Sequence, residues 1–329
     1  LSGTSSYDEV LKRIEGAKKE DWLTGRGWDQ NDWPDPPKGI WPTAVDLDQV
    51  TTGPTALRRI DGHAVWVNSE VLKMAGIDAS TPDPKGGQII RHVDTNEPTG
   101  VLLDTAAGLI PSPSLSHAER EANLKNGLAV IASKGLTGVH TMGVSDETLK
   151  IYEELNDGGA LPVRVWVYLQ PEANATKRLL ESGPWGKEHL QVIGIKAFAD
   201  GALGSRGAWL RDDYSDQPGH RGTPIHSLEY LTELASQALK VEAQVAAHAI
   251  GDQGVKTVLD AFAAARRQNP GQNHIPLRLE HAQVIHPDDM NRFAELNVIA
   301  SMQPSHATSD MPWAEARLGP ERTTWAYAW

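Results

Sequence analysis

The sequence of 329 residues contains no cysteine. This absence excludes a disulfide framework, a thiolate metal site and a cysteine nucleophile, so a metal would need histidine, carboxylate or modified lysine ligands. Lysine and arginine number only 31 against 43 aspartates and glutamates, and no run of basic residues interrupts the mixed pattern. This charge has the wrong sign for a nucleic-acid-binding protein and favours a small-molecule substrate as the partner.

The sequence also lacks long apolar runs. No stretch approaches the roughly 18 uninterrupted apolar residues that a membrane span requires, and residues 1–30 lack the charged-then-apolar pattern of a signal peptide. Hydrophobic residues still make up 40% of the chain, which is enough for a large buried core. We therefore expect a globular cytoplasmic protein without a membrane partner. The chain starts at Leu1 rather than Met, and we expect both of its ends to be cut.

From about residue 117 onward, polar stretches with helical periodicity alternate with short apolar stretches rich in β-branched residues. This alternation is typical of parallel strands joined by helices. No glycine-rich phosphate loop follows a strand, so a (β/α) barrel is favoured over an open doubly wound sheet. A closed barrel needs eight strands, and two are unaccounted for. The predicted strands are 138–142, 163–169, 193–198, 243–248, 277–281 and 298–302, and the predicted helices are 117–133, 146–157, 227–240 and 253–267.

Residues 1–116 have a different pattern, in which two strand-like segments, 88–93 and 100–103, flank a turn at 94–98. This spacing predicts a β-hairpin. We therefore divide the chain into an accessory α+β region, 1–116, and a partial (β/α) barrel, 117–329.

A barrel carries its active site at the carboxyl ends of its strands. His140, His248 and His281 lie at or near such ends, and Lys196 lies within a strand. A lone histidine in this position is more often a hydrogen-bonded core residue than a ligand. Histidines on neighbouring strands, however, converge on the barrel axis, where neutral imidazoles would present nitrogen lone pairs to a divalent ion.

Lys196 lies among apolar residues of its strand, where an ammonium ion is costly to bury and must be paired, neutralised or modified. A salt bridge with Asp200, four residues further on, meets this requirement. Metal ligation meets it as well, and the residues alone do not choose between the two.

Two neighbouring acidic residues have structural interpretations. Glu280 points to the face opposite His281 by strand alternation, so we expect it to contact Arg278 or the helix layer. Asp252 precedes the helix predicted at 253–267, so we expect it to be the N-cap of that helix.

Seven segments carry recognisable motifs: RIDGHAVWVNS at 59–69, TPDPKGG at 81–87, PTGVL at 98–102, IKAFADGALGSR at 195–206, AHAIGD at 247–252, LEHAQ at 279–283 and SDMPW at 309–313. In this order they resemble the amidohydrolase superfamily, in the amidohydrolase-3 branch that includes N-substituted formamide deformylases. Because the motifs are independent and extend over nearly the whole chain, chance does not explain the resemblance.

The resemblance implies a metal centre built from a His-x-His pair on the first strand, a Lys or acidic residue on the fourth, His on the fifth and sixth, and Asp on the eighth. Lys196, His248 and His281 occupy the Lys position and the last two His positions. It further implies one or two divalent ions, with zinc favoured, and places Lys196 at a position where the lysine is carbamylated in many family members. The implied reaction is hydrolysis of a non-peptide carbon-nitrogen bond, in an amide, formamide or cyclic amide, by metal-activated water.

The chain departs from this pattern, because no His-x-His occurs in it and its last aspartate, Asp310, matches the loop after strand seven. The six predicted strands then match strands two to seven of a (β/α)8 TIM barrel of the metal-dependent hydrolase type. About half of the expected ligands are present. We therefore expect this chain alone to bind metal weakly or not at all and to have little activity.

Four further residues are candidates for substrate binding. His63 and Trp66 belong to the motif expected to line the pocket from the accessory region, with a structural turn at Gly62 as the alternative. Asp200 and Arg206 belong to the loop after the lysine strand, whose glycines permit close approach to a ligand. Arg206 would orient a polar substrate, unless it is a solvated surface residue.

Two other functions fit the same architecture. A glycoside hydrolase would need two strand-end carboxylates about 5 to 10 Å apart, and Asp200 has no obvious partner at the end of strand seven. A non-catalytic barrel fragment is the other alternative. Its open edges would make self-association into a homo-oligomer unsurprising.

Overall fold

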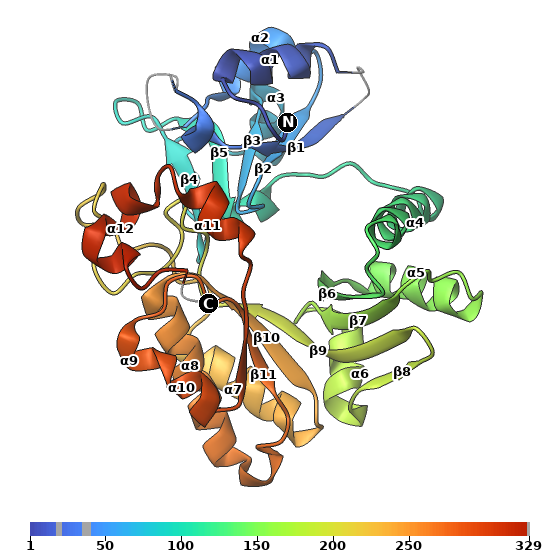
Figure 1. Ribbon diagram of the computed structural model, residues 1–329. Helices are drawn as coiled ribbons and strands as arrows, with labels where there is room; N and C mark the ends of the chain where they lie inside the picture. The colour runs from blue at the N-terminus through green and yellow to red at the C-terminus, as the bar shows by residue number, and fades with distance from the viewer. Residues whose placement is uncertain (18–21, 35–40, 328–329) are drawn as a thin grey trace. The chain divides into compact units, whose positions relative to one another are not determined.

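The computed structural model describes residues 1–17, 22–34 and 41–327, which form two compact units (Figure 1). The first unit combines Leu1–Pro113, Asp200–Ile225 and Pro304–Ala326. The second unit combines Ser114–Ala199 and His226–Gln303, together with Tyr327. The first boundary lies close to the predicted border at 116/117. Beyond that border the predicted division into 1–116 and 117–329 differs from the structure, because segments 200–225 and 304–326 belong to the first unit.

The first unit contains a five-stranded sheet in the order β1-β2-β3-β5-β4. β1 and β2 are parallel, and the other neighbours are antiparallel. The predicted hairpin is confirmed, because β4 and β5 pair across the turn. The strands are β1 (Leu23–Trp28), β2 (Thr55–Arg59), β3 (Ala64–Val67), β4 (Gly87–Arg91) and β5 (Pro98–Asp104). The helices are α1 (Tyr7–Glu15), η1 (Gln30–Asp32), α2 (Ala44–Val50), α3 (Ser69–Ala75), η2 (Thr105–Leu109), α11 (Ser305–Asp310) and α12 (Ala314–Thr323).

Aromatic side chains form much of the core of the first unit. Trp28, Trp33 and Trp66 are buried in one cluster, and the Tyr7 ring stacks against it, 6.0 Å from the Trp66 ring. The indole Nε1 of Trp66 donates to the carbonyl of Thr43 at 2.8 Å. β3 is the central strand of the sheet and is buried on both faces, with Ala64 and Trp66 in this cluster and Val65 and Val67 in a second one.

Replacement of two glycines by alanine is expected to change the stability of the protein in opposite directions. Gly100 in β5 has φ +101°, and a Cβ there would lie 2.6 Å from the Val67 carbonyl oxygen, so Gly100→Ala should destabilise by about 1–3 kcal/mol. Gly127 lies inside a helix, where an added Cβ would have no atom within 4 Å, so Gly127→Ala should stabilise by about 0.5–1 kcal/mol. Urea unfolding of both variants measures the difference, and equal midpoints would contradict this account.

The second unit contains six parallel strands that follow one another in sequence order, β6-β7-β9-β10-β11-β12, with β8 antiparallel to β9. All six predicted strands and all four predicted helices are confirmed, with ends shifted by a few residues at most. The strands are β6 (Gly138–Val144), β7 (Arg164–Leu169), β8 (Trp185–Lys187), β9 (Leu190–Phe198), β10 (Gln244–Ala249), β11 (Leu277–His281) and β12 (Val298–Ser301). The helices are α4 (His117–Ser133), α5 (Asp146–Asp157), α6 (Asn174–Ser182), α7 (Leu228–Lys240), α8 (Asp252–Gln268), η3 (Pro270–Gln272), α9 (Pro287–Met290) and α10 (Arg292–Glu295).

Each of these parallel strands lies beside its predecessor, and the order does not reverse as it does in a doubly wound sheet. β6 and β12 are the two ends of the sheet order. The observed architecture is thus an α/β sheet with parallel strands. Within the described ranges, no helix is long and apolar enough to cross a bilayer.

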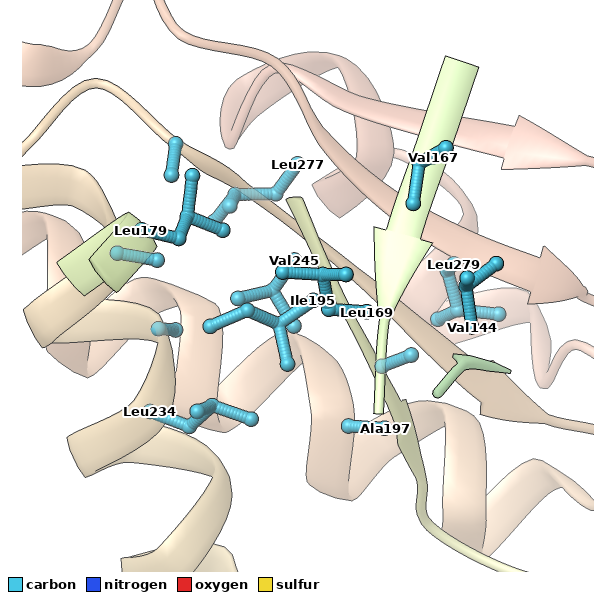
Figure 2. Close-up of a cluster of buried hydrophobic side chains, with 14 of the residues drawn as sticks. Val144, Val167, Leu169, Leu179, Ile195, Ala197, Leu234, Val245, Leu277 and Leu279 are labelled. Carbon is cyan, nitrogen blue, oxygen red and sulfur yellow. The ribbon is translucent and has the colours of Figure 1, made fainter. Parts of the chain in front are cut away.

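The two faces of the parallel sheet differ in chemistry. One face is apolar: Ile195, Val245 and Leu277 lie in a large buried cluster, which also includes Leu234 of α7 (Figure 2). Side chains alternate between the two faces of a strand, so the residues next to these point to the opposite face. We call that opposite face the polar face.

Candidate active site

The polar face brings together the three predicted metal-ligating residues. Lys196 on β9 is only 5% exposed, and its Nζ lies 3.8 Å from the centre of the Phe198 ring and donates to the Ala197 carbonyl at 3.0 Å. His248 on β10 is buried, and its ring centroid lies 4.5 Å from that of His281 on β11 in an edge-on arrangement. Three adjacent strands therefore present two imidazoles and an amine on one side of the sheet.

The His281 side chain lies on the polar face because the regular extended backbone of β11 stops at this residue. Its Cα is the partner of Ala249, whose side chain belongs to the apolar cluster, so regular alternation would turn His281 toward the helices. Its φ is instead +76°, and Ala282 follows with φ +46°. Two successive non-glycine residues in this region are unusual, and such strain is concentrated at functional sites.

The same backbone turn corrects the interpretation of Glu280. Glu280 pairs with His248 in register and so shares the polar face with it instead of facing away from His281. Its predicted contact with Arg278 is confirmed, with Nε to Oε1 at 2.7 Å and Nη2 to Oε2 at 3.2 Å. Burial alone raises the pKa of Glu280, but the bonds and charge of Arg278 outweigh it and lower the pKa, so the carboxylate stays ionised.

A hydrogen bond sets the tautomer of His281. Its Nδ1 lies 2.5 Å from Oε1 of Gln303, an oxygen that only accepts, so Nδ1 carries the proton and Nε2 the lone pair of the neutral ring. Metal-ligating histidines are typically held in this way. Among the described residues, however, no group of three or more histidine, aspartate or glutamate side chains is arranged to hold a metal ion. The donor set fits part of a metal centre and does not complete one.

His140 lies on β6, further along the sheet. Its ring centroid is 5.4 Å from that of Trp166 and 5.9 Å from that of Tyr168. Burial and the nearby Arg278 charge lower the pKa of His140, which favours the neutral ring. The structure places it among aromatic side chains rather than beside the other two histidines.

The first unit holds the other predicted binding residues. Gly62 has φ +82° and forms the turn after β2, and the His63 amide donates to Oδ1 of Asp61 at 2.9 Å. The His63 ring contacts a residue that sequence reasoning missed: Nδ1 lies 2.7 Å from Oδ1 of Asp104, the last residue of β5. Asp104 lies just beyond the 98–102 motif. The sequence signal that could have indicated Asp104 is its position as a polar residue at the end of an apolar strand.

Three of the predicted binding residues have structural roles. Trp66 is a fully buried core residue, which corrects its assignment to the substrate pocket. Arg206 is buried rather than solvated and donates to Asp216 through Nε at 3.1 Å and Nη2 at 2.8 Å. Asp200 is fully buried and accepts a hydrogen bond from the Trp209 amide at 2.8 Å, which closes its own loop.

The predicted N-cap role of Asp252 is wrong by one position. Asp252 is the first residue of α8, and Gly251 is the N-cap.

Comparison with known proteins identifies the family of the chain. Residues 1–329 match the amidohydrolase family along their whole length. The chain belongs to this family, in its amidohydrolase-3 branch. This amidohydrolase chain is 36% identical to the putative amidohydrolase YtcJ of Bacillus subtilis (strain 168) over 343 residues, which cover 100% of the chain and 63% of YtcJ. It is 30% identical to N-substituted formamide deformylase of Arthrobacter pascens, covering 78% of the chain and 49% of that protein.

Solved structures give the same relationship. The amidohydrolase chain superposes with a TM-score of 0.72 on an uncharacterized metal-dependent hydrolase from Pyrococcus horikoshii OT3, at 28% identity. The match covers 99% of the chain and 63% of that structure. The chain therefore spans about three fifths of the length of YtcJ and of the Pyrococcus hydrolase.

Proposed function

We propose that this chain functions within a metal-dependent amidohydrolase that hydrolyses a carbon-nitrogen bond other than a peptide bond, in an amide, a formamide or a cyclic amide. The observation that carries the proposal is the meeting of Lys196, His248 and His281 on one face of the parallel sheet. The likeness to an N-substituted formamide deformylase supports the type of bond.

His248 and His281 would hold a divalent ion through ring nitrogens, and nitrogen and oxygen donors of this kind suit zinc. Lys196 would add an oxygen donor after its neutral amine attacks carbon dioxide and loses a proton, which converts the amine into a carbamate. When bound, the ion would lower the pKa of a water molecule and polarise the substrate carbonyl. Gln303 holds His281 in the tautomer that this role requires.

We propose further that the six-stranded sheet is the wall of a (β/α)8 barrel. The strand order is sequential and leaves β6 and β12 at its ends, where two more strands would close the barrel. Because the relatives are longer than this chain, we assign the two closing strands and the remaining metal ligands to sequence outside residues 1–329.

The test uses the full-length protein, with its zinc content measured by mass spectrometry and its hydrolysis of a panel of N-substituted formamides and amides measured by amine release. His248→Ala is expected to lower hydrolysis by at least about 10³-fold, since charge stabilisation by the metal contributes several kcal/mol. The matched control is His274→Ala, an exposed histidine of the same unit. Full activity in His248→Ala, or hydrolysis that persists after complete removal of metal, would contradict the proposal.

A further inference from the structure

A cavity of about 360 Å³ lies in the second unit between α5 and the hairpin formed by β8 and β9. β8 runs antiparallel to the first residues of β9, with Trp185 opposite Val192 (Figure 1). Leu190 and Val192 line the cavity and belong to the large apolar cluster, so the cavity lies on the side of the sheet opposite the polar face. Its volume is in the range of small-molecule sites. The proposed hydrolytic reaction makes no use of it.

Two features of the sequence hold β8 close against β9. Gly186 is needed in β8, because a Cβ there would lie 2.3 Å from the Leu190 carbonyl oxygen. Glu188, in the turn of the hairpin, has φ +50°, a conformation that a non-glycine residue adopts at a cost in free energy. The wall that β8 adds to the cavity is therefore fixed by the backbone of the hairpin.

The cavity combines an apolar floor with an aromatic wall. Leu190 is 4% exposed, and Val192 is fully buried. The Trp185 side chain also lines the cavity, and the guanidinium carbon of Arg178 lies 4.1 Å from the centre of its ring. This cation–π contact holds the indole ring in place. A ligand that fits between these side chains has an apolar body.

The charged side chains at the cavity are mainly acidic and lie at the end of α5. The last turn of this helix carries Glu153, Glu154 and Asp157 and no basic residue, although the carboxyl end of a helix favours cations. Lys187 pairs with Asp157 at 2.8 Å, and His117 bonds to Glu154 at 2.8 Å. Glu153 lines the cavity, is partly exposed and has no ion pair among the described residues. Its carboxylate and the negative end of the helix favour a positively charged ligand.

We propose that this cavity binds a primary amine in its ammonium form, with the nitrogen at the Glu153 carboxylate and an apolar body against Trp185, Leu190 and Val192. A carboxylate ligand is disfavoured, because Glu153 and the carboxyl end of α5 would repel it. A neutral molecule of the same shape would leave the charge of Glu153 without a partner. The inference goes beyond the proposed function and does not depend on it, since the charge and shape of the cavity define the ligand.

Isothermal titration calorimetry of the full-length protein with benzylamine tests the proposal. We expect saturable binding, and binding of benzyl alcohol that is about tenfold weaker, because this compound has the same ring without the charge. Glu153→Gln should weaken benzylamine binding about tenfold, since a charge-assisted hydrogen bond is lost. The matched control is Glu147→Gln, which removes the same charge from the exposed first turn of α5 and should leave the affinity unchanged.

A second variant tests the aromatic wall. Trp185→Leu keeps an apolar side chain but removes the ring, so benzylamine should bind about 3- to 10-fold more weakly, as expected when a contact between two aromatic rings is lost. Circular dichroism checks that the variant folds. An unchanged affinity in Trp185→Leu would show that the ligand does not touch the indole and would overturn the placement.

A variant of the polar face determines where benzylamine binds. If His248→Ala abolishes binding and Glu153→Gln does not, the amine binds at the polar face and the proposal is wrong. Equal affinity of the wild type for benzylamine and benzyl alcohol, or no saturable binding of benzylamine, would also overturn it. Binding that depends on Glu153 in a protein that hydrolyses no amide would contradict the hydrolase proposal and support this site.

Discussion

Replacement of Arg59 by methionine is expected to lower the free energy of unfolding by about 3–5 kcal/mol, the loss typical when one partner of a buried ion pair is removed. The Arg59 side chain is 1% exposed and bonds to the carboxylates of Asp29 and Asp61 and, at 2.8 Å, to Oε1 of Gln30. Methionine would leave both carboxylates beside an apolar group of similar length. Urea unfolding followed by circular dichroism measures the change.

An exposed arginine provides the control. Arg13 pairs with Glu9 at 2.6 Å one helical turn away, with its side chain 44% exposed, so Arg13→Met should change stability by less than about 0.5 kcal/mol. Equal losses in the two variants would show that burial does not set the strength of the Arg59 network.

The effect of Arg59→Met should also depend on pH. Burial alone raises the pKa of Asp61, but the charge of Arg59 outweighs it and lowers the pKa below the ordinary value of 3.8. A depressed carboxyl pKa stabilises the fold above the unfolded value, and this stabilisation is lost as the pH falls through the folded value. The gap between wild type and variant should therefore narrow in acid and be full at neutral pH.

The second unit could be predicted from sequence because its signals are local. Short β-branched strands alternate with amphipathic helices, and the helices at 117–133 and 146–157 begin and end where predicted. The assembly of the first unit depends instead on contacts between distant segments. Asp216 binds both Arg206 and Arg317, and Arg317 donates to Asn31 at 2.8 Å. No local pattern reveals a bond between residues almost 300 positions apart.

The candidate site also combines residues that local sequence patterns reveal with residues that they do not. Lys196 and His248 were found because a polar residue in an apolar strand is conspicuous, and period-two alternation places them on one face. Alternation gave the wrong relation between Glu280 and His281, because the positive φ of His281 carries no sequence signal in a non-glycine residue. Asp104 was missed because its importance arises from its contact with the ring of His63, 41 positions away in the sequence.

Replacement of Lys196 should affect chemistry far more than folding. We expect Lys196→Met to lower kcat/KM of the full-length protein by at least about 10³-fold, since several kcal/mol of metal-dependent stabilisation would be lost. Stability should change by about 1 kcal/mol or less, because methionine keeps an apolar stem against the Phe198 ring and removes the cost of burying an ammonium group. Amine release and urea unfolding give the two values.

Lys196→Arg separates a carbamate from a simple positive charge at this position. Arginine keeps the charge, but its guanidinium stays protonated and so cannot take up carbon dioxide as a neutral amine does. If Lys196 acts as a carbamate, Lys196→Arg should be as inactive as Lys196→Met and retain less zinc than the wild type. Substantial activity in Lys196→Arg would mean that the cation itself is required. The two buried basic residues then differ in kind: Arg59 is held by two carboxylates and its replacement destabilises the fold, whereas replacement of Lys196 lowers catalytic activity.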